Sequence, residues 1–424
     1  MPIINATDRQ RSIYLDGLSG KKPVIPFHAH ALRESAQKRL SAKAWAYIDG
    51  GAGDEEGIAA NTAAFSKWSI APHMMHPNET ADFSTSLFGM NLAFPLLLAP
   101  IGALDLICPG ADRLVASSCK ETGIPFIFSN QAGTPMEECA AAMGDIPRWF
   151  QLYWSKSDDL VLSFVRRAEA CGCRAIVLTV DTTLLGWRSR DLALGHLPFL
   201  QGKRIAQYTS DKVFMEILTR GGLSLTKPPT PPVTLTTVIN LLRQKANHPG
   251  GFWKNLFSKQ PLEAVRLFSN IYSNPALSWD KLNWLRSQTT LPLLIKGILR
   301  PDDALHAKAS GADGIIISNH GARQVDGAIP TLDSLIRIRK VLPRPFPILL
   351  DSGIRSGSDM FKALALGADA VLLGRPYAYG LAISKKQGVR DVTTNLLNDF
   401  ELTARMAGCR NLREINETLV TLRY

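Results

Sequence analysis

The sequence predicts an α/β fold in which eight parallel strands close into a (β/α)8, or TIM, barrel. Eight short apolar runs follow one another along the chain, and segments of helix length separate most of them. The runs lie at residues 95–99, 125–128, 148–152, 175–180, 291–295, 314–317, 347–350 and 370–373. A doubly wound open sheet is the main alternative, but no Gly-x-Gly-x-x-Gly follows the first run and no Walker loop is present.

A helical layer is expected before the first strand. Apolar residues recur at helical spacing from Ala31 to Leu40, Ser41 can cap a second helix, and Gly50 with Gly51 can end it. The acidic residues 54–56 then favour the start of a third helix. We expect residues 1–85 to form an N-terminal helical segment packed on the barrel, 86–385 the barrel itself, and 386–424 a C-terminal helical segment.

A long insertion interrupts the barrel after the fourth strand. The stretch between residues 180 and 291 is far too long for one crossover, so we expect an insertion at about 195–285. It carries a proline-rich piece at 228–232 and aromatic residues at Phe252, Trp253 and Phe257. Insertions of this kind serve as lids or contact surfaces, and a solvated or subunit-contact loop is the reading we favour.

Composition and charge exclude several classes of protein. The 424 residues are 46% hydrophobic and 20% charged, with a net charge of +11, and no nucleic-acid-binding module accompanies the basic excess. The six cysteines lack the spacing of a zinc site, so free thiols and no metal are expected. Residues 1–11 have no apolar core, and the apolar run at 94–104 is too short to span a bilayer. We expect a cytoplasmic protein without a transmembrane segment, with peripheral membrane association left open.

Polar side chains follow the strands where a barrel places its active groups, at the carboxyl ends. The sixth run ends in Ser318-Asn319-His320-Gly321, and Arg323 follows three residues after His320. An imidazole can accept a proton near neutral pH, and a guanidinium can hold a carboxylate with two hydrogen bonds. The pair suggests a site that deprotonates a group next to a carboxylate. A histidine satisfied within a loop, beside a surface arginine, is the alternative.

The seventh and eighth strand ends combine glycine and arginine. Gly353 and Arg355 follow one strand, and Gly374 and Arg375 follow the other. Loops in these positions form the usual phosphate site of the fold, so a phosphorylated ligand is expected, with two ordinary surface loops as the alternative. Lys296 ends the fifth strand, where burial would be costly without an anionic partner.

These strand ends match a known family. From about residue 47 to 381 the chain resembles the FMN-dependent L-2-hydroxy acid oxidases and dehydrogenases. The motifs are Phe150-Gln151-Leu152-Tyr153, Thr179-Val180-Asp181-Thr182, Ile295-Lys296-Gly297, and residues 318–324 and 362–368. Segments 13–20, 50–55, 186–192, 351–355 and 375–378 are similar to the lactate 2-monooxygenases of that family, which also carry a long insertion after strand four.

The resemblance implies FMN as the cofactor and a role for each matching residue. His320 would be the base, Asp181 would steady its imidazolium form, Tyr153 would hydrogen-bond the substrate hydroxyl, and Lys296 would stabilise the reduced flavin. Arg188, Arg323 and Tyr47 would bind the substrate carboxylate, although a Tyr47 packed only on the core is equally compatible with its spacing. The residues implied in FMN binding are Pro100, Ile101, Gly102, Ser129, Gln151, Thr179, Lys296, Ser318, Asp351, Gly353, Arg355, Gly374 and Arg375.

The expected function follows from this resemblance. It is the FMN-dependent oxidation of a small L-2-hydroxy acid, foremost L-lactate, by molecular oxygen, as in a lactate 2-monooxygenase that forms acetate, carbon dioxide and water. Gly102 replaces the alanine of many oxidases and would leave room for product to linger. The alternatives are an oxidase that releases pyruvate and hydrogen peroxide, a quinone-linked dehydrogenase, and a non-catalytic barrel that binds a phosphorylated ligand. A homotetramer or homo-octamer is also implied.

Overall fold

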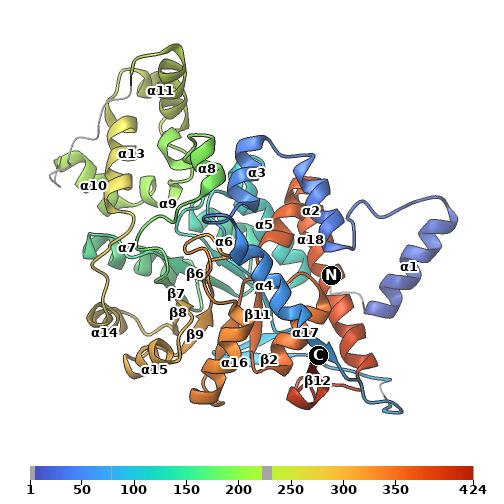
Figure 1. Cartoon of the computed structure of the whole chain (residues 1–424). Coiled ribbons are helices and arrows are strands. Elements are labelled where there is room, and N and C mark those ends of the chain that lie inside the picture. Colours follow the sequence, from blue (N-terminus) through green and yellow to red (C-terminus); the bar gives the residue numbers. More distant parts are fainter. Residues whose placement is uncertain (1–4, 78, 222–231, 424) are drawn as a thin grey trace.

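The computed structural model describes residues 5–77, 79–221 and 232–423, and its centre is a closed barrel of eight parallel strands (Figure 1). The strands are β4 (Leu96–Leu98), β5 (Phe126–Phe128), β6 (Arg148–Leu152), β7 (Ile176–Thr179), β8 (Leu293–Ile298), β9 (Gly314–Ile317), β10 (Ile348–Leu350) and β11 (Ala370–Leu373). They run around the barrel in chain order, and β11 pairs with β4 to close it. The predicted TIM barrel is confirmed, and every predicted apolar run overlaps one strand.

One strand extends beyond its predicted end. The apolar run was expected to finish at residue 295, but β8 continues through Lys296 to Ile298, with a shift of register against β9 between these two residues. The shift occurs at Gly297, which has a φ of 110°, a backbone conformation that glycine adopts readily and other residues rarely adopt. A Cβ added at Gly297 would lie 2.7 Å from the Cβ of Asp181. This close approach brings the ends of β7 and β8 together.

The helices that cover the barrel alternate with its strands. They are α5 (Ala111–Thr122), α6 (Met136–Met143), α7 (Asp158–Ala170), α14 (Trp279–Gln288), α15 (Pro301–Ala309), α16 (Thr331–Val341), α17 (Gly357–Ala365) and α18 (Arg375–Met406). The short turns η1 (Leu104–Leu106) and α8 (Ser189–Ala193) follow β4 and β7. Outward-facing strand residues such as Ile315 and Ile317 are buried against the helices, whereas Ile316 points into the barrel. Burial on both faces explains why these strands are uninterrupted apolar runs.

A β-hairpin closes the amino-terminal end of the barrel. Strands β2 (Thr85–Leu87) and β3 (Met90–Leu92) pair antiparallel, and Leu87, Met90 and Leu92 join the side chains inside the barrel in one buried cluster. The Nε1 of Trp149 lies 3.3 Å from the sulfur of Met90, and the Trp149 ring meets the ring of Phe88 edge-on. This end of the barrel is therefore filled with apolar side chains, and the cavity described below lies at the other end.

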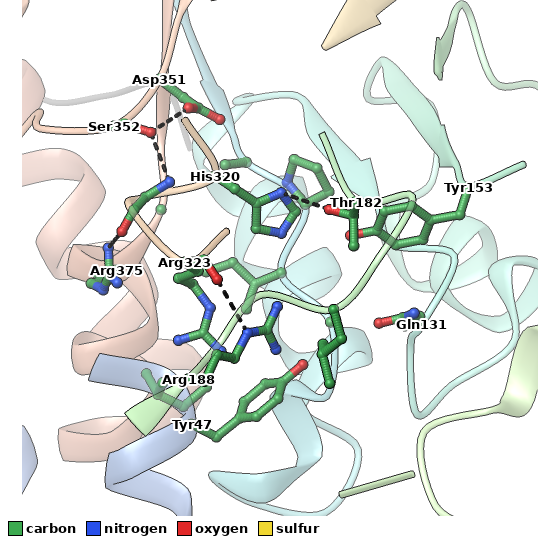
Figure 2. A pocket seen from close by; sticks show the side chains of 18 of the residues that line it. Tyr47, Gln131, Tyr153, Thr182, Arg188, His320, Arg323, Asp351, Ser352 and Arg375 are labelled. Atoms are coloured by element: carbon green, nitrogen blue, oxygen red, sulfur yellow. Dashed lines mark hydrogen bonds between the residues drawn. The ribbon is translucent and has the colours of Figure 1, made fainter. Parts of the chain in front are cut away.

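The described part of the N-terminal layer contains four helices, α1 (Ala6–Leu18), α2 (Ala29–Gln37), α3 (Ala42–Asp49) and α4 (Glu56–Ser66). The last three agree with the predicted helices, including the Ser41 hydroxyl, which accepts a hydrogen bond from the backbone N–H of Ala44. Buried Asp49 ties the layer together because it accepts hydrogen bonds from Arg33, Arg190 and the hydroxyl of Tyr379. Tyr47, on α3, is thereby held over the carboxyl end of the barrel (Figure 2).

The first helix was not predicted. Helix α1 is capped by the Asn5 side chain and contacts α18, where the backbone N–H of Ala6 donates to Glu401. Only Ala6 of this helix is buried, and the rest projects from the body (Figure 1).

The insertion after β7 is helical rather than an irregular loop. Its described part contains η2 (Pro198–Gln201), α9 (Ala206–Thr209), α10 (Lys212–Arg220), α11 (Leu235–Asn247), α12 (Phe252–Leu256) and α13 (Gln260–Ile271). Tyr208 lies among Phe164 of α7, Phe214 and Phe268 in an aromatic core that joins the insertion to the barrel. Of the expected proline-rich piece at 228–232, residues 228–231 lie outside the described residues.

The C-terminal region packs back on the barrel and on the N-terminal layer. Helix α18 changes direction at Ser384 and Lys385, whose backbone angles are not helical, close to the boundary expected at residue 386. After η3 (Glu417–Leu419), β12 (Val420–Leu422) pairs antiparallel with β1 (Trp68–Ile70). None of the helices described here is long and apolar enough to cross a membrane.

Candidate active site

A cavity of about 330 Å³ opens at the carboxyl ends of the barrel strands (Figure 2). Most of the sequence-predicted site residues line it. These are Tyr47, Pro100, Ile101, Gly102, Tyr153, Arg188, Lys296, His320, Arg323, Asp351, Gly353, Arg355, Gly374 and Arg375. The other five, Ser129, Gln151, Thr179, Asp181 and Ser318, are outside this wall. Asp181 and Ser318 nevertheless hydrogen-bond residues that line it.

His320 and Asp181 form a hydrogen-bonded pair. The His320 Nδ1 lies 2.8 Å from Asp181 Oδ1, and the hydroxyl of Thr182 donates to the same carboxylate oxygen. Burial raises the pKa of Asp181, but its interaction with His320 and the charge of Lys296 outweigh the effect of burial and hold that pKa at about 2. An ionised carboxylate can only accept, so Nδ1 carries the proton and Nε2 keeps its lone pair. Burial, helped by Lys296 and Arg188, lowers the pKa of His320, which favours the neutral base.

The backbone around His320 is strained in a way that holds the imidazole in place. His320, Gly321 and Ala322 have φ values of 58°, 63° and 61°, and such a conformation costs about 1–3 kcal/mol for a residue other than glycine. Hydrogen bonds maintain it, since the N–H of His320 donates to Ser318 and the N–H of Gly321 donates to Ser352. Strain of this kind is common at functional sites.

Lys296 is a buried cation with two acidic neighbours. Its Nζ lies 3.1 Å from Asp351 and 4.0 Å from Asp181, and it donates a 2.7 Å hydrogen bond to the hydroxyl of Ser318. Burial lowers the pKa of Lys296, but Asp351 and Asp181 raise that pKa by more than burial lowers it, so the ammonium group stays charged. A fixed positive charge therefore lies at the wall of the cavity, next to the His320–Asp181 pair.

Two arginines share the ring of Tyr47. The guanidinium carbon of Arg323 lies 4.9 Å from the ring centre and that of Arg188 lies 5.8 Å from it (Figure 2). Neither arginine has an ion pair among the described residues, and Nη2 of Arg323 is buried without a hydrogen-bond partner. Burial and the nearby charge of Arg188 lower the pKa of Arg323 to about 9. The carboxylate of Asp191 attracts both guanidinium groups but makes no ion pair with either among the described residues. The two cations therefore still favour an added anion, and a carboxylate fits a guanidinium best.

A second anion site lies at the seventh and eighth strand ends. Burial lowers the pKa of Arg355, and no carboxylate pairs with the Arg355 or Arg375 side chain in the described part of the chain. Gly353, with φ of 112°, leaves no space for a side chain, because an added Cβ would lie 2.7 Å from the Phe65 ring and 2.8 Å from the Asn61 carbonyl oxygen. The cradle of glycine backbone and arginine charge fits a phosphate.

Two of the predicted residues outside the cavity wall also have unused hydrogen-bonding capacity. Nε2 of Gln151 and Oγ1 of Thr179 are buried without a partner, although Gln151 Oε1 accepts from the hydroxyl of Ser129. Polar atoms buried in this way are costly unless a ligand satisfies them. Together with the phosphate cradle and the charge of Lys296, these atoms fit the polar edge and the phosphate of FMN.

Sequence reasoning missed several residues of the cavity wall. Three of them lie within two positions of residues that were singled out at strand ends, so their place in the sequence could have identified them. They are Gln131, Thr182 and Ser352. Other wall residues come from the β7–α8 loop and the insertion, where no motif marked them. They are Leu185, Leu197, Phe199, Leu200, Phe268, Ser269 and Tyr272. The insertion thus covers one side of the cavity with apolar and aromatic groups.

Fold and site together define a barrel enzyme that binds a small organic acid beside a phosphorylated cofactor. The chain belongs to the FMN-dependent dehydrogenase family, whose profile matches residues 36–422. It is an FMN-dependent 2-hydroxy acid oxidoreductase, as the resemblance implied.

Relatives and solved structures agree with this assignment. The chain is 34% identical over 408 residues to an L-lactate oxidase of Lysinibacillus sphaericus, covering 96% of this chain and 95% of that protein. It is 35% identical over 387 residues to 2-hydroxyacid oxidase 1 of Mus musculus, covering 90% of this chain and 92% of that protein. A structure of mandelate oxidase with (S)-4-hydroxymandelic acid superimposes with a TM-score of 0.77 at 30% identity, covering 94% and 99% of the two chains.

Proposed function

We propose that this enzyme oxidises L-lactate with molecular oxygen and releases acetate, carbon dioxide and water, as a lactate 2-monooxygenase does. The observation that carries the proposal is the meeting of a neutral, carboxylate-bound imidazole with two unpaired arginines at one cavity. A 2-hydroxy acid needs both, because its carboxylate must be held while a proton is taken from the neighbouring carbon or hydroxyl group. A barrel that only binds a phosphorylated ligand needs neither.

The proposed substrate position follows from the charges. Arg323 and Arg188 bind the carboxylate beside the Tyr47 ring, and the hydroxyl group faces Tyr153, whose own pKa is raised by burial so that it stays a donor. Nε2 of His320 accepts a proton from the substrate. Asp181, ionised and 2.8 Å from Nδ1, stabilises the imidazolium that forms. This pairing keeps the proton on His320 until it is returned to solvent or oxygen.

FMN, when bound, accepts two electrons from the substrate and passes them to oxygen. We propose that Arg355, Arg375 and the backbone at Gly353 and Gly374 hold its phosphate. Ser129, Gln151, Thr179 and Ser318 would contact the ring or the ribityl chain, with Asp351 at the ribityl chain and Pro100, Ile101 and Gly102 against one face of the ring. Lys296 would place its charge where the reduced ring becomes negative.

The fate of the first product decides between monooxygenase and oxidase. Pyruvate that stays beside hydrogen peroxide is converted to acetate, carbon dioxide and water, whereas pyruvate that leaves first is the product of a plain oxidase. One feature supports retention. Insertion residues such as Phe199 and Phe268 cover one side of the cavity with aromatic rings. Gly102 adds no free space, because an added Cβ would lie 3.2 Å from Gln131, in tight contact.

Release of pyruvate and hydrogen peroxide is the second candidate outcome, favoured by the similarity to proteins named L-lactate oxidase. Product analysis in air separates the two. Acetate and carbon dioxide in equal amounts support the monooxygenase, whereas pyruvate with an equal amount of peroxide replaces it by the oxidase. Anaerobic bleaching of the flavin by L-lactate, compared with glycolate and mandelate, tests the choice of substrate. Slow reaction with oxygen and rapid reduction of a dye would indicate a dehydrogenase instead.

We also propose that copies of the chain assemble into a homotetramer or homo-octamer. Apolar side chains that would benefit from burial are exposed near the cavity mouth, including Leu184, Trp187 and Val325. Light scattering of the FMN-loaded protein would give the mass of the assembly, and a monomer at micromolar concentration would contradict the proposal.

A further inference from the structure

Helix α11 (Leu235–Asn247) of the insertion is amphipathic, but its orientation is inverted. Its polar side faces the protein, because Gln244 donates to the carbonyl of Leu200 and Asn247 donates to the carbonyl of Gln201. No residue of this helix is buried. In a surface helix of a globular protein the apolar stripe faces the core. In α11 the apolar side, which would normally pack on the core, faces outward instead.

The outward side of α11 is a continuous apolar stripe. Helical spacing places its members on one face, and each is at least 38% exposed. They are Leu235, Val238, Ile239, Leu241 and Leu242. Figure 1 shows α11 at the tip of the molecule, far from the barrel, and the stripe stays partly exposed although α12, α13 and η2 contact this helix.

The neighbouring helix α12 (Phe252–Leu256) extends the same surface. Lys245 follows Leu241 by four positions on the same side of α11, and its Nζ donates to the carbonyls of Asn255, Leu256 and Ser258. The end of α12 is therefore fixed beside the apolar stripe. Trp253, near the start of α12, and Phe257, just after its end, are 78% and 89% exposed. We call the α11 stripe with Trp253 and Phe257 the tip surface.

The charge around the tip surface has one sign. Between Glu216 and Glu263 the sequence contains no Asp or Glu, whereas the basic residues on and beside α11 and α12 are Arg243, Lys245, Lys254 and Lys259. Arg243, Lys254 and Lys259 have no ion pair among the residues that the structure describes. Basic residues around exposed aliphatic and aromatic side chains match an anionic lipid surface, where Trp and Phe enter the headgroup region and Lys and Arg bind the lipid charges.

We propose that the tip surface docks the enzyme on an anionic membrane, as a peripheral contact with α11 lying in the plane of the interface. This goes beyond the proposed function and does not depend on it, because lipid binding needs no turnover. A second copy of the chain is the less favourable occupant. Two-fold contact through the same surface would bring the basic residues of both copies together, and like charges oppose such a contact.

Vesicle co-sedimentation of the FMN-loaded full-length protein tests the proposal. We expect binding to vesicles of phosphatidylcholine with phosphatidylserine, weak binding to pure phosphatidylcholine, and a decrease as salt is raised. The double change Ile239→Ser with Leu242→Ser should weaken binding about tenfold or more. Lys254→Glu should weaken it more than roughly fivefold, because it removes one basic charge and adds an acidic one.

Matched controls come from the other side of the molecule. Leu18→Ser on α1, where Leu18 is 86% exposed, and Lys340→Glu on α16 should leave vesicle binding unchanged. Flavin absorbance and melting temperature should be the same in all variants, which shows that each is folded and loaded with flavin. Equal binding to both kinds of vesicle, or none to either, would overturn the proposal. So would a dimer in light scattering that the α11 variants abolish, since that result assigns the surface to a second copy.

Discussion

The two ends of the barrel are built from the same eight strands, but one end is packed with apolar side chains and the other contains the polar cavity. At the amino end the hairpin β2–β3 and Trp149 fill the interior with apolar contacts. At the carboxyl end, buried atoms of Gln151, Thr179, Asp181 and Arg323 have no hydrogen-bond partner. Stability is thus concentrated at one end, and the carboxyl end holds polar groups whose partners are a cofactor and a substrate. Substitutions at the two ends should therefore separate turnover from stability.

The largest effect on turnover is expected for His320→Gln. Loss of the base should reduce kcat by about 10²–10⁴-fold, while the protein stays yellow and its melting temperature changes little. Stopped-flow measurement of flavin reduction by L-lactate under nitrogen checks this. His30→Gln, at a site 80% exposed on α2, is the control and should have normal rates. Near-normal turnover in the His320 variant would remove this residue from its proposed role.

The opposite behaviour is expected for Trp149→Ala at the amino end. Removing this fully buried ring leaves a cavity and should cost about 3–5 kcal/mol of unfolding free energy. The KM for L-lactate of the folded protein should stay the same, because Trp149 does not line the active-site cavity. Chemical denaturation with parallel kinetics measures both quantities. Trp253→Ala, at an exposed position, should change neither, and a large rise in KM for Trp149→Ala would contradict the separation of the two ends.

Arg323→Met tests the separation of turnover from stability at the carboxyl end of the barrel, because it removes a buried charge. Loss of a charge-assisted hydrogen bond to the substrate should lower kcat/KM by roughly 10–100-fold, largely through KM. The melting temperature should stay equal or rise, since repulsion from Arg188 and burial already disfavour the Arg323 charge. Steady-state kinetics and thermal melts of the flavin-loaded protein test both expectations. A clear loss of stability would show that Arg323 supports the fold through its bond to Gly50.

The smallest effects concern pH. The base form of His320 is needed, and burial lowers its pKa, so kcat/KM should stay level below pH 6.5 and fall only as pH drops through the lowered value. Asp181 affects stability at more acidic pH. Its pKa falls from 3.8 to about 2 on folding, so it contributes about 2 kcal/mol above pH 3.8, and that contribution is lost between pH 3.8 and 2. Asp181→Asn should flatten this part of the stability profile.

Much of the barrel could be predicted because its strands are buried on both faces. Gly314–Ile317 is a plain apolar run and was located without error, whereas β8 was predicted too short because Lys296 interrupts its apolar pattern. The strand continues there because Asp351 and Ser318 satisfy the ammonium, and both come from other strands. Strand ends also revealed most of the candidate site, since parallel strands gather their carboxyl ends on one side.

The parts that were missed depend on long-range contacts or lack a pattern. Phe199 and Phe268 reach the cavity because Arg204 of the insertion bonds Asp105 and an aromatic core fixes the insertion on α7, and neither contact has a local signature. Helix α1 buries only Ala6, so its sequence has no apolar periodicity to detect. The inverted orientation of α11 likewise could not be predicted, because an amphipathic pattern does not say which side faces the protein.

The pairing of β4 with β11 has a consequence for biosynthesis. Leu96–Leu98 emerges early from the ribosome, but its partner Ala370–Leu373 is translated only after most of the chain. At about 5–20 residues per second the edge of β4 waits on the order of tens of seconds for closure. During that time a nascent polypeptide with an open, apolar sheet edge is exposed to aggregation. We therefore expect chaperone dependence during synthesis to end once residue 373 has left the exit tunnel.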